Sequence, residues 1–506
     1  MRSLALTVLL AIALLPGGNL LRADVLKRTM NHAYVVDLAI DLAKEPYREK
    51  KSRLPRFLRE LTYDDYRRIR FLPEQALWEA DPSPFKVHFF HPGFIHERGV
   101  RIHEFTDDFT QRIPFVRAFF DYQDLRVPGR LPGDLDYAGF KVLYALNTPD
   151  RMDEVISFLG ASYYRALGRT HRYGISARGL ALNSGGPETE EFPSFVEFWL
   201  GKPGADAHEI VIHALLDSPS VAGAYTFKVV PGDETVMEVQ ATLVFRQTVA
   251  IIGLAPMTSM FWYGENSPSR HGDFRPEVHD SDGLLVATDA QSRVWRPLMN
   301  PHEVTRTDIP APALGGFGVL QRDRLFSSYE DMEAAYQHRP GLWMEPIGSW
   351  PAGRVRLVEL PTPDEYHDNI VAFWIPEVSP AAGEPMELAY RLRWTSASFY
   401  AGPSGYVSDV RQEVKQAGEG RTLYVIDFSP NGLERFPPGA EVVPQVEVPG
   451  SVVIEHMSAQ HNDVDGSWRL AIRLLANDRS QPVEIRARLM LGGEPITETV
   501  QLRWKP

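Results

Sequence analysis

Two acidic segments of this chain contain residue types that could perform chemistry. The first is DFRPEVHDSDGL (residues 273–284) and the second is PTPDEYHDNIVAFW (residues 361–374). Each joins several carboxylates and a histidine to a following apolar run, which predicts acids held at a strand end, within reach of a substrate. Cleavage of a glycosidic bond needs one carboxylic acid to protonate the leaving oxygen and one carboxylate to activate water or attack carbon. The two segments therefore indicate a carbohydrate-cleaving site.

The second segment supplies the predicted general acid. Asp364, Glu365 and Asp368 lie within five positions. If the turn brings them together, their repulsion raises the pKa of at least one carboxyl toward the range that a general acid needs. We choose Asp368, because it directly precedes the apolar run that begins at Asn369 and is fixed by the start of that strand.

The first segment supplies the predicted base. Asp280 is the candidate and Asp282 is its competitor, although Asp282 precedes Gly283 and could equally be a structural turn residue. An inverting enzyme needs about 6.5–9.5 Å between the two carboxyls, which leaves room for a water, whereas a retaining enzyme needs about 5 Å. The sequence leaves this separation open.

Sugar sites also need aromatic platforms and polar partners, because the apolar face of a pyranose stacks on a ring while its hydroxyls form hydrogen bonds. Two arginines could pair with the acids and hold them ionised, or could be ordinary surface partners. The substrate-binding candidates in or beside the acidic segments are Trp262, Tyr263, Asp282, Trp295, Arg275 and Arg296.

Metal binding is the main alternative for the acidic segments. Asp280-Ser281-Asp282-Gly283 resembles part of a calcium loop, and His279 beside it could serve a transition metal. The twelve-residue loop with its terminal glutamate is missing, and the histidines lack helical ligand spacing. We therefore predict neither a metal nor another cofactor.

Composition excludes several classes of function. The chain has 506 residues, with 53 Lys and Arg against 66 Asp and Glu, for a net charge of -13. This charge opposes binding of a phosphate backbone, so nucleic acid is not an expected partner. The absence of cysteine from the sequence excludes disulfides, zinc-thiolate sites, iron-sulfur clusters and cysteine nucleophiles. The length predicts two domains.

The amino terminus resembles a secretory signal. Met1 and Arg2 precede an apolar run from 4 to 15, which Pro16, Gly17 and Gly18 close. A retained anchor is the alternative, but twelve apolar residues fall short of the about 20 that span a bilayer. We predict a signal peptide over residues 1–23 and therefore export.

The middle of the chain predicts antiparallel strands. Tyr225, Phe227 and Val229 alternate with polar residues, and a Pro-Gly-Asp turn leads into a second alternating run over 237–245. With prolines and glycines spread along the chain, the fold class is predicted as all-β, with a large antiparallel β-sandwich. Helices are predicted to be a minority, with the clearest over about 152–167 and a second over about 25–42.

Four proline and glycine residues between 376 and 385 predict a domain boundary. Short alternating strands follow, at 468–474, 483–489 and 500–504, which is typical of an immunoglobulin-like β-sandwich. The predicted domains are therefore 24–377, the large sandwich, and 383–506, the immunoglobulin-like domain.

Several long motifs together resemble the OpgG/OpgD (MdoG) family of periplasmic glucan biosynthesis proteins. They are the two acidic segments, FPSFVEFW (192–199), WRPL (295–298) and GFGVLQRDR (316–324). The resemblance implies a mutarotase-like sandwich followed by an immunoglobulin-like domain, and residence in the periplasm. It also implies a role in making osmoregulated periplasmic glucans, through inverting enzymes that act on β-1,2-glucan.

The resemblance further implies roles for individual residues. Asp368 matches the acid of the family, and Tyr336 matches a position implicated in a relay of hydroxyl groups through which the base acts on its water. Glu365 also matches a site residue. Tyr336 could instead be a half-buried packing residue. The implied partners are β-1,2-glucan and the inner-membrane glucan synthase, and a homodimer stays open.

The sequence is consistent with three functions. The first is an inverting β-1,2-glucan hydrolase, and the second is a transglycosylase in which a sugar hydroxyl replaces water and closes a ring. The third is a non-catalytic protein that binds or guides the glucan. The presence of both acidic segments argues against the third.

Overall fold

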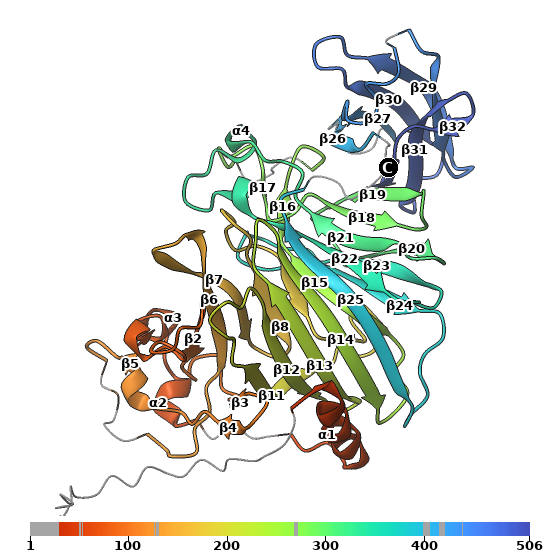
Figure 1. Cartoon of the computed structure of the whole chain (residues 1–506). Coiled ribbons are helices and arrows are strands. Elements are labelled where there is room, and N and C mark those ends of the chain that lie inside the picture. The colour runs from red at the N-terminus through yellow and green to blue at the C-terminus, as the bar shows by residue number, and fades with distance from the viewer. Residues whose placement is uncertain are drawn as a thin grey trace, which may run out of the picture.

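The fold is described from a computed structural model, which is drawn in Figure 1. The described residues are 30–49, 52, 54–125, 127, 131–267, 272–397, 405–413, 420–437 and 439–506. The predicted signal peptide and its cleavage after Ala23 lie outside these residues. Strands predominate, which confirms the predicted all-β sandwich class. The short helical elements are α1 (His32–Lys44), α2 (Arg56–Arg59), α3 (Tyr63–Tyr66), α4 (Phe326–Tyr329), η1 (Pro73–Gln75), η2 (Arg117–Phe119) and η3 (Tyr336–His338).

One sheet of the main sandwich has ten strands within the described residues, and all of its neighbouring strands run antiparallel. Its order is β2 (Phe85–Phe90), β6 (Gly139–Thr148), β7 (Arg151–Leu159), β8 (Tyr163–Ala166), β9 (Ser176–Arg178), β15 (Ile252–Ser259), β24 (Ile370–Pro376), β23 (Gly353–Glu359) and β20 (Thr305–Ala311), with β10 (Ala181–Leu182) paired to β15.

The other large sheet has fifteen strands within the described residues and runs from the main sandwich into the carboxy-terminal region (Figure 1). Its order is β28 (Val442–Glu447), β31 (Val483–Leu491), β33 (Thr499–Trp504), β19 (Arg293–Pro297), β18 (Gly283–Ala287), β21 (Gly316–Leu320), β22 (Gly341–Ile347), β25 (Pro385–Thr395), β14 (Thr235–Phe245), β13 (Val221–Val230), β12 (Ile210–Asp217), β11 (Ser194–Gly201), β3 (Arg101–Phe105) and β4 (Thr110–Arg112), with β32 (Glu494–Pro495) paired to β31.

Smaller sheets complete the fold. The strands of the carboxy-terminal sheet are β26 (Val407–Gln412), β27 (Arg421–Phe428), β30 (Trp468–Ala476) and β29 (Val452–His461), in that order. The two-stranded pairs are β1 (Arg70–Phe71) with β5 (Phe120–Asp121), and β16 (Phe261–Tyr263) with β17 (Val278–His279). The pair β16–β17 lies near α4, at the edge of the main sandwich that faces the carboxy-terminal region (Figure 1).

Aromatic side chains from both large sheets interlock in the main core. The ring of Phe140 on β6 meets that of Phe198 on β11 edge to face at 5.0 Å, and Phe158 on β7 meets Phe227 on β13 at 5.2 Å. All four residues are buried. Burial of such rings between two sheets is the main source of stability in a sandwich.

The predicted central hairpin is confirmed. Strands β13 and β14 pair antiparallel, with Tyr225 opposite Ala241 and Phe227 opposite Val239. All three predicted inward residues of β13, Tyr225, Phe227 and Val229, are buried, as the alternation required. The predicted carboxy-terminal strands are likewise present as β30, β31 and β33.

The helix predicted over 152–167 is wrong. The segment forms β7 and β8, joined by a turn in which Gly160 and Ala161 have left-handed backbone angles, φ 80° and 43°. The apolar spacing that favoured a helix arises because β7 is covered on both faces from Val155 to Phe158. A strand buried on both sides has a continuous apolar run, which helical spacing also fits.

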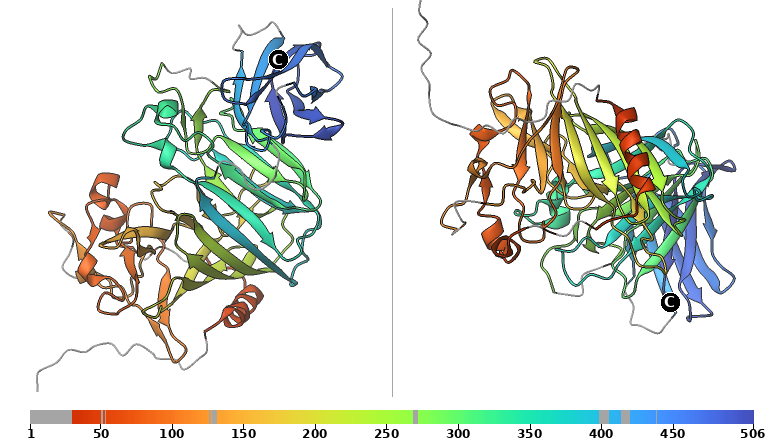
Figure 2. Two further views of the ribbon diagram at one scale, coloured as in Figure 1. Left: turned by 45° about the horizontal axis from the view of Figure 1, so that its top comes forward. Right: turned by 90° about the horizontal axis from the view of Figure 1, so that it is seen from below.

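The predicted amino-terminal helix is present as α1, shifted toward the carboxyl end. The Asn31 side chain accepts a hydrogen bond from the backbone NH of Tyr34 at 2.9 Å and so starts the helix. Val35 and Ala39 are its buried residues and face Trp199 in a small core on the outer side of β12–β14. Figure 2 shows α1 lying across these strands.

The predicted boundary between 377 and 383 needs correction. β25 begins at Pro385, yet it pairs with β14 and β22 inside the large sheet. Residues 377–384 therefore connect two strands of the main sandwich, β24 and β25. The carboxy-terminal sandwich begins after β25. The boundary was misplaced because a proline-rich loop at a sandwich edge has the same composition as an interdomain linker.

The carboxy-terminal sandwich continues the architecture of the main one. β33 pairs in parallel with β19, with Val294 opposite Thr499, so backbone hydrogen bonds join the two sandwiches. Their shared core contains Trp295 and Trp343 of the main sandwich together with Trp468 of β30. Among the helices of the described chain, we find none with the length and apolar character required to cross a membrane.

Candidate functional site

The two predicted catalytic carboxylates are held by the same short backbone segment, 259–261. The backbone NH of Asp280 donates to the carbonyl of Met260 at 2.8 Å. The NH of Asn369 donates to the carbonyl of residue 259 at 3.1 Å, and its side-chain amide bonds both the NH and the carbonyl of residue 261. Asp280 and Asp368, the neighbour of Asn369, are therefore brought together from segments that are distant in sequence.

Asp280 is a buried carboxylate with a charged partner. It is 4% exposed and forms an ion pair with Arg339. Burial raises its pKa to about 6, while Arg339 opposes the rise and the negative charge of Asp368 adds to it. Asp280 is thus ionised at neutral pH and becomes protonated as the pH falls through about 6.

Asp368 is accessible to solvent although protein atoms surround its carboxyl group closely. Its side chain is exposed, yet desolvation by the neighbouring groups raises its pKa, against the positive charges of Arg165 and Arg339. Both carboxyls therefore lie in the field of Arg339. A raised pKa on an accessible carboxyl is the property that a general acid requires.

Arg275 connects the two acidic segments. Its guanidinium binds the carboxylates of Asp273 at 2.8 Å, Asp331 at 2.9 Å and Glu365 at 2.7 Å. Glu365 also accepts a hydrogen bond from the hydroxyl of Tyr336. The pKa of Tyr336 is raised by burial and by this hydrogen bond, so the phenol keeps its proton.

The backbone around Tyr336 is shaped for this contact. Ala335 has a left-handed φ of 46°, and Asp331 accepts hydrogen bonds from the NH groups of residues 333 and 334, which fixes the turn that leads to η3. The guanidinium of Arg339 lies over the Tyr336 ring at 4.2 Å. Because Arg339 also pairs with Asp280, one chain of contacts runs from Glu365 to the candidate base.

Asp282 occupies a structural position. Its Oδ2 atom accepts hydrogen bonds from the backbone NH groups of Arg322 at 2.6 Å and Asp323 at 3.1 Å. A Cβ atom on the next residue, Gly283, would lie 2.0 Å from the indole of Trp295. The glycine of the DSDG motif is therefore required by close packing, and we assign Asp282 to holding this turn.

Trp262 and Tyr263 lie beside the site in a small apolar cluster that includes Tyr336. Tyr263 is 2% exposed and its hydroxyl donates to the carbonyl of Arg275 at 3.4 Å. Its ring therefore supports Arg275 and offers no free face to a sugar. Trp262 is half-buried.

Two predicted substrate-binding residues belong to the core, which corrects those assignments. Trp295 is 3% exposed, and the guanidinium of Arg322 lies 3.5 Å from its ring centroid. Arg296 is 1% exposed and binds the buried carboxylate of Glu359 at 3.4 Å. Both face inward because the carboxy-terminal sandwich and the β20–β23 pair cover this part of the sheet, which no local pattern reveals.

Sequence reasoning missed the arginines that control the two acids. Arg339 follows Tyr336 by three positions, a spacing that could have identified it. Arg165 lies on β8, in the segment predicted as a helix, so its approach to Asp368 was hidden by the wrong element. Each arginine is distant in sequence from the carboxyl group on which it acts, so only the fold brings them together.

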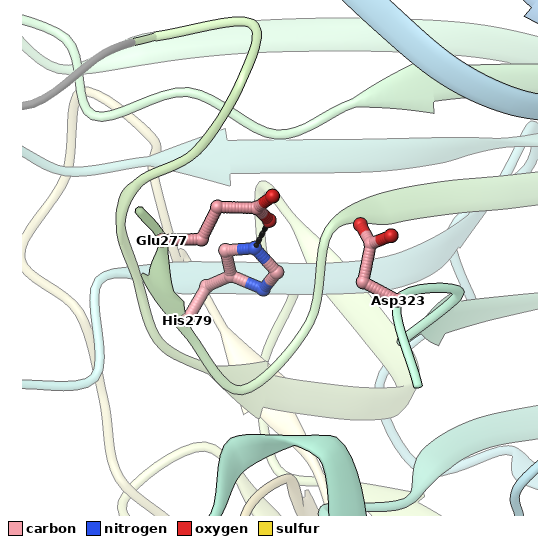
Figure 3. A group of neighbouring side chains, drawn as sticks. All are labelled: Glu277, His279 and Asp323. Carbon is pink, nitrogen blue, oxygen red and sulfur yellow. Dashed lines mark hydrogen bonds and ion pairs between the residues drawn. The ribbon is translucent and has the colours of Figure 1, made fainter. Parts of the chain in front are cut away.

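A second group of ionisable residues lies next to Asp280. Glu277, His279 and Asp323 face one another in Figure 3. His279 Nε2 contacts Glu277 at 2.7 Å, and Nδ1 contacts Gln321 Oε1 at 2.9 Å. Burial alone would lower the pKa of His279, but the hydrogen bond to Glu277 and the nearby carboxylates raise it. Each ring nitrogen of His279 thus faces a side-chain oxygen, of Glu277 at Nε2 and of Gln321 at Nδ1.

Comparison with known proteins finds related sequences over nearly the whole chain. Residues 30–504 match the family described as "Periplasmic glucan biosynthesis protein, MdoG". The chain is 42% identical over 469 residues to "Glucans biosynthesis protein G" of Ralstonia nicotianae, which covers 91% of this chain and 93% of that protein.

Two further relatives carry the same name. The protein of Pseudomonas aeruginosa is 42% identical over 477 residues, covering 92% of this chain and 91% of the relative. The protein of Sodalis glossinidius is 39% identical over 509 residues, covering 99% and 96%. The chain described here therefore belongs to the MdoG family of periplasmic glucan biosynthesis proteins.

Proposed function

We propose that the protein is a periplasmic enzyme that cleaves internal linkages of β-1,2-glucan with inversion of configuration. Asp368 is the general acid and Asp280 is the base. The observation that carries this proposal is their convergence: both are anchored to segment 259–261, and the charge of each acts with that of Arg339. Two carboxyls with raised pKa values and a common arginine suit acid and base roles at one bond.

In the proposed reaction Asp368 donates its proton to the oxygen of the departing sugar, while a water attacks the opposite face of the ring. Asp280, held ionised by Arg339, receives the proton of that water. Tyr336 donates its own proton to Glu365, so its oxygen lone pairs remain available to a water or a sugar hydroxyl. A relay through Tyr336 takes a proton from the water or sugar hydroxyl onto the phenol oxygen as the phenol's own proton passes to an acceptor, which in this structure is Glu365.

Exposed apolar side chains beside the site support contact with a sugar chain. Phe274, Met332 and Tyr366 are 77%, 85% and 85% exposed. Each directly follows a carboxylate that binds Arg275, so the three side chains emerge around one guanidinium. Exposed rings and thioethers at this density favour a binding surface, and the faces of pyranose rings pack well on them.

The proposed activity is tested by incubating the protein without residues 1–23 with linear β-1,2-glucan. We expect shorter oligosaccharides whose new reducing ends are first released as the α-anomer, which NMR detects at early times. A matched incubation with β-1,4-glucan is expected to give no products. Cyclic products would support the transglycosylase instead, and an unchanged glucan that still binds would support a non-catalytic role.

The pH dependence provides a separate test of the base. Since Asp280 must be ionised to accept a proton and its pKa is raised to about 6, kcat/KM is expected to fall as the pH decreases below about 6. Circular dichroism at each pH serves as the control for folding. A kcat/KM that stays constant down to pH values near the ordinary aspartate pKa of about 4 would argue against Asp280 as the base.

Periplasmic residence is part of the proposal. It rests on the predicted signal peptide and on the description of the matching family. The inner-membrane glucan synthase is the proposed protein partner, since the nascent glucan would emerge from it into the same compartment.

A further inference from the structure

Four acidic side chains interact with one another next to the buried imidazole of His279. They are Glu265 after β16, Glu277 before β17, Asp282 before β18 and Asp323 after β21. The ligand atoms of Glu277, His279 and Asp323 lie within 4.8 Å of one another, and Figure 3 shows the Glu277 carboxylate bonded to the ring and the Asp323 carboxylate beside them. Asp282 acts electrostatically on Asp323 and on Glu265, so it faces the same group. We call these five residues the His279 cluster.

The His279 cluster leaves a buried oxygen without a partner. Asp282 is 8% exposed and its Oδ2 atom holds the turn at 322–323, but its Oδ1 atom is buried with no hydrogen-bond donor in the described structure. The carboxylate of Asp323 also receives no donor from the described residues, because the hydrogen bonds of Asp323 are made by its backbone. Buried carboxylate oxygens of native proteins normally have hydrogen bonds or ion partners.

The two arginine side chains nearby form their hydrogen bonds and ion pairs with groups outside the His279 cluster. The guanidinium of Arg322 binds Glu498, and that of Arg324 donates to the backbone carbonyls of residues 337, 339 and 395. The acidic side chains of the His279 cluster repel one another in a largely buried space, and burial together with this repulsion raises the pKa of Glu265 and of Asp323. A cation bound between them would offset the repulsion and provide the missing partner of Asp282 Oδ1.

We propose that the His279 cluster binds a divalent cation of the calcium class through the carboxylates of Glu277, Asp282 and Asp323, with Glu265 beside them. The available donors are oxygen atoms, which hard cations prefer. His279 acts as a hydrogen-bonded neighbour and not as a ligand, because Glu277 and Gln321 occupy its two nitrogens. Calcium accepts several carboxylate oxygens in a flexible arrangement, whereas magnesium requires near-ideal octahedral geometry and usually keeps several of its waters.

The cation site would have a structural consequence for the neighbouring residues. Asp282 and Asp323 come from two loops, which are already joined by the hydrogen bonds that the backbone NH groups of Arg322 and Asp323 donate to Asp282 Oδ2. A cation at Oδ1 would bind the same two loops from the other side and so hold the turn that carries Asp280. The site is independent of the proposed glucan cleavage, because burial and unpaired charge define it.

The test is calcium binding by the whole protein without residues 1–23, after treatment with a chelator. Calorimetric titration with calcium chloride is expected to show one saturable site. The melting temperature is expected to rise by about 2 °C or more at saturation, since a ligand that binds only the folded state stabilises it. Magnesium chloride at matched ionic strength is expected to bind at least about tenfold more weakly.

Asp323→Asn distinguishes the proposed site from unspecific effects of salt. This variant is expected to lose the calcium-dependent rise in melting temperature, while its metal-free melting temperature stays equal or increases, because one of several like charges is removed. Glu303→Gln, which changes a largely exposed acid outside the cluster, is the matched control and should keep the rise.

Two results would overturn the proposal: no saturable binding at millimolar calcium, or an unchanged calcium response in Asp323→Asn. Glu277→Gln is measured in the same way and answers the question if Asp323→Asn does not fold. The glucan assay stays separate, since calcium binding without glucan cleavage would contradict the proposed function alone.

Discussion

Asp368→Asn is expected to slow the cleavage of β-1,2-glucan by at least about a hundredfold, because a positioned general acid contributes about 10²–10⁴ in rate. The amide keeps the shape of the side chain but cannot give a proton to the leaving oxygen. Asn369 still anchors the strand start to segment 259–261, so the variant should remain folded. The measurement is kcat on linear glucan, with the melting temperature as the check on folding.

Asp364→Asn is the matched control, since it makes the same chemical change in the same loop. The Asp364 carboxylate accepts hydrogen bonds from the NH of Tyr366 and from the His367 ring, so it stabilises the turn. Its rate should stay within a few-fold of the parent. A β-linked glucoside with a strongly acidic phenol as leaving group needs no protonation, and Asp368→Asn should lose much less activity on it. Near-normal cleavage of glucan by Asp368→Asn would remove Asp368 from the acid role.

Arg322→Ala is expected to lower the free energy of unfolding by about 3–5 kcal/mol, as is usual when one partner of a buried ion pair is removed. The guanidinium is 3% exposed and binds both oxygens of Glu498, at 2.6 and 3.2 Å, as well as the carbonyl of Val407. It also covers the ring of Trp295. Without it the Glu498 carboxylate stays buried, and the donor that it keeps among the described residues is the NH of Val407.

Chemical denaturation monitored by tryptophan fluorescence measures this loss. Arg393→Ala removes a more exposed arginine, which pairs with Glu234 and Glu345, and should cost less than about 1 kcal/mol. The double variant Arg322→Met, Glu498→Leu should recover part of the loss, because no buried charge is then unpaired. An Arg322→Ala loss no larger than that of Arg393→Ala would mean that the pair contributes little to joining the sandwiches.

Strands that bury one face could be predicted from the sequence, and strands that bury both could not. The alternation over Tyr225–Val229 has one register that hides the aromatic side chains, and the structure has that register. The segment from Val155 to Phe158 is covered on both faces, so its apolar run fitted a helix equally well. β25 follows a proline-rich loop, and its place between β14 and β22 depends on pairings with distant strands.

The candidate site shows the same division between local and distant information. Asp280 and Asp368 could be proposed together because each lies in a short polar segment directly before an apolar strand. Trp295 was misjudged because the carboxy-terminal sandwich, distant in sequence, covers its ring. The role of Arg275 in binding three carboxylates from separate loops follows only from the folded arrangement, although the residue itself was a candidate.

The parallel pairing of β33 with β19 has a mechanical consequence. A force applied to the carboxy-terminal sandwich passes through backbone hydrogen bonds to β19 and then to β18, which begins at Gly283 directly after the turn that carries Asp280. This route is continuous β-sheet. A partner that binds the carboxy-terminal sandwich and rotates it would therefore displace the turn that carries Asp280.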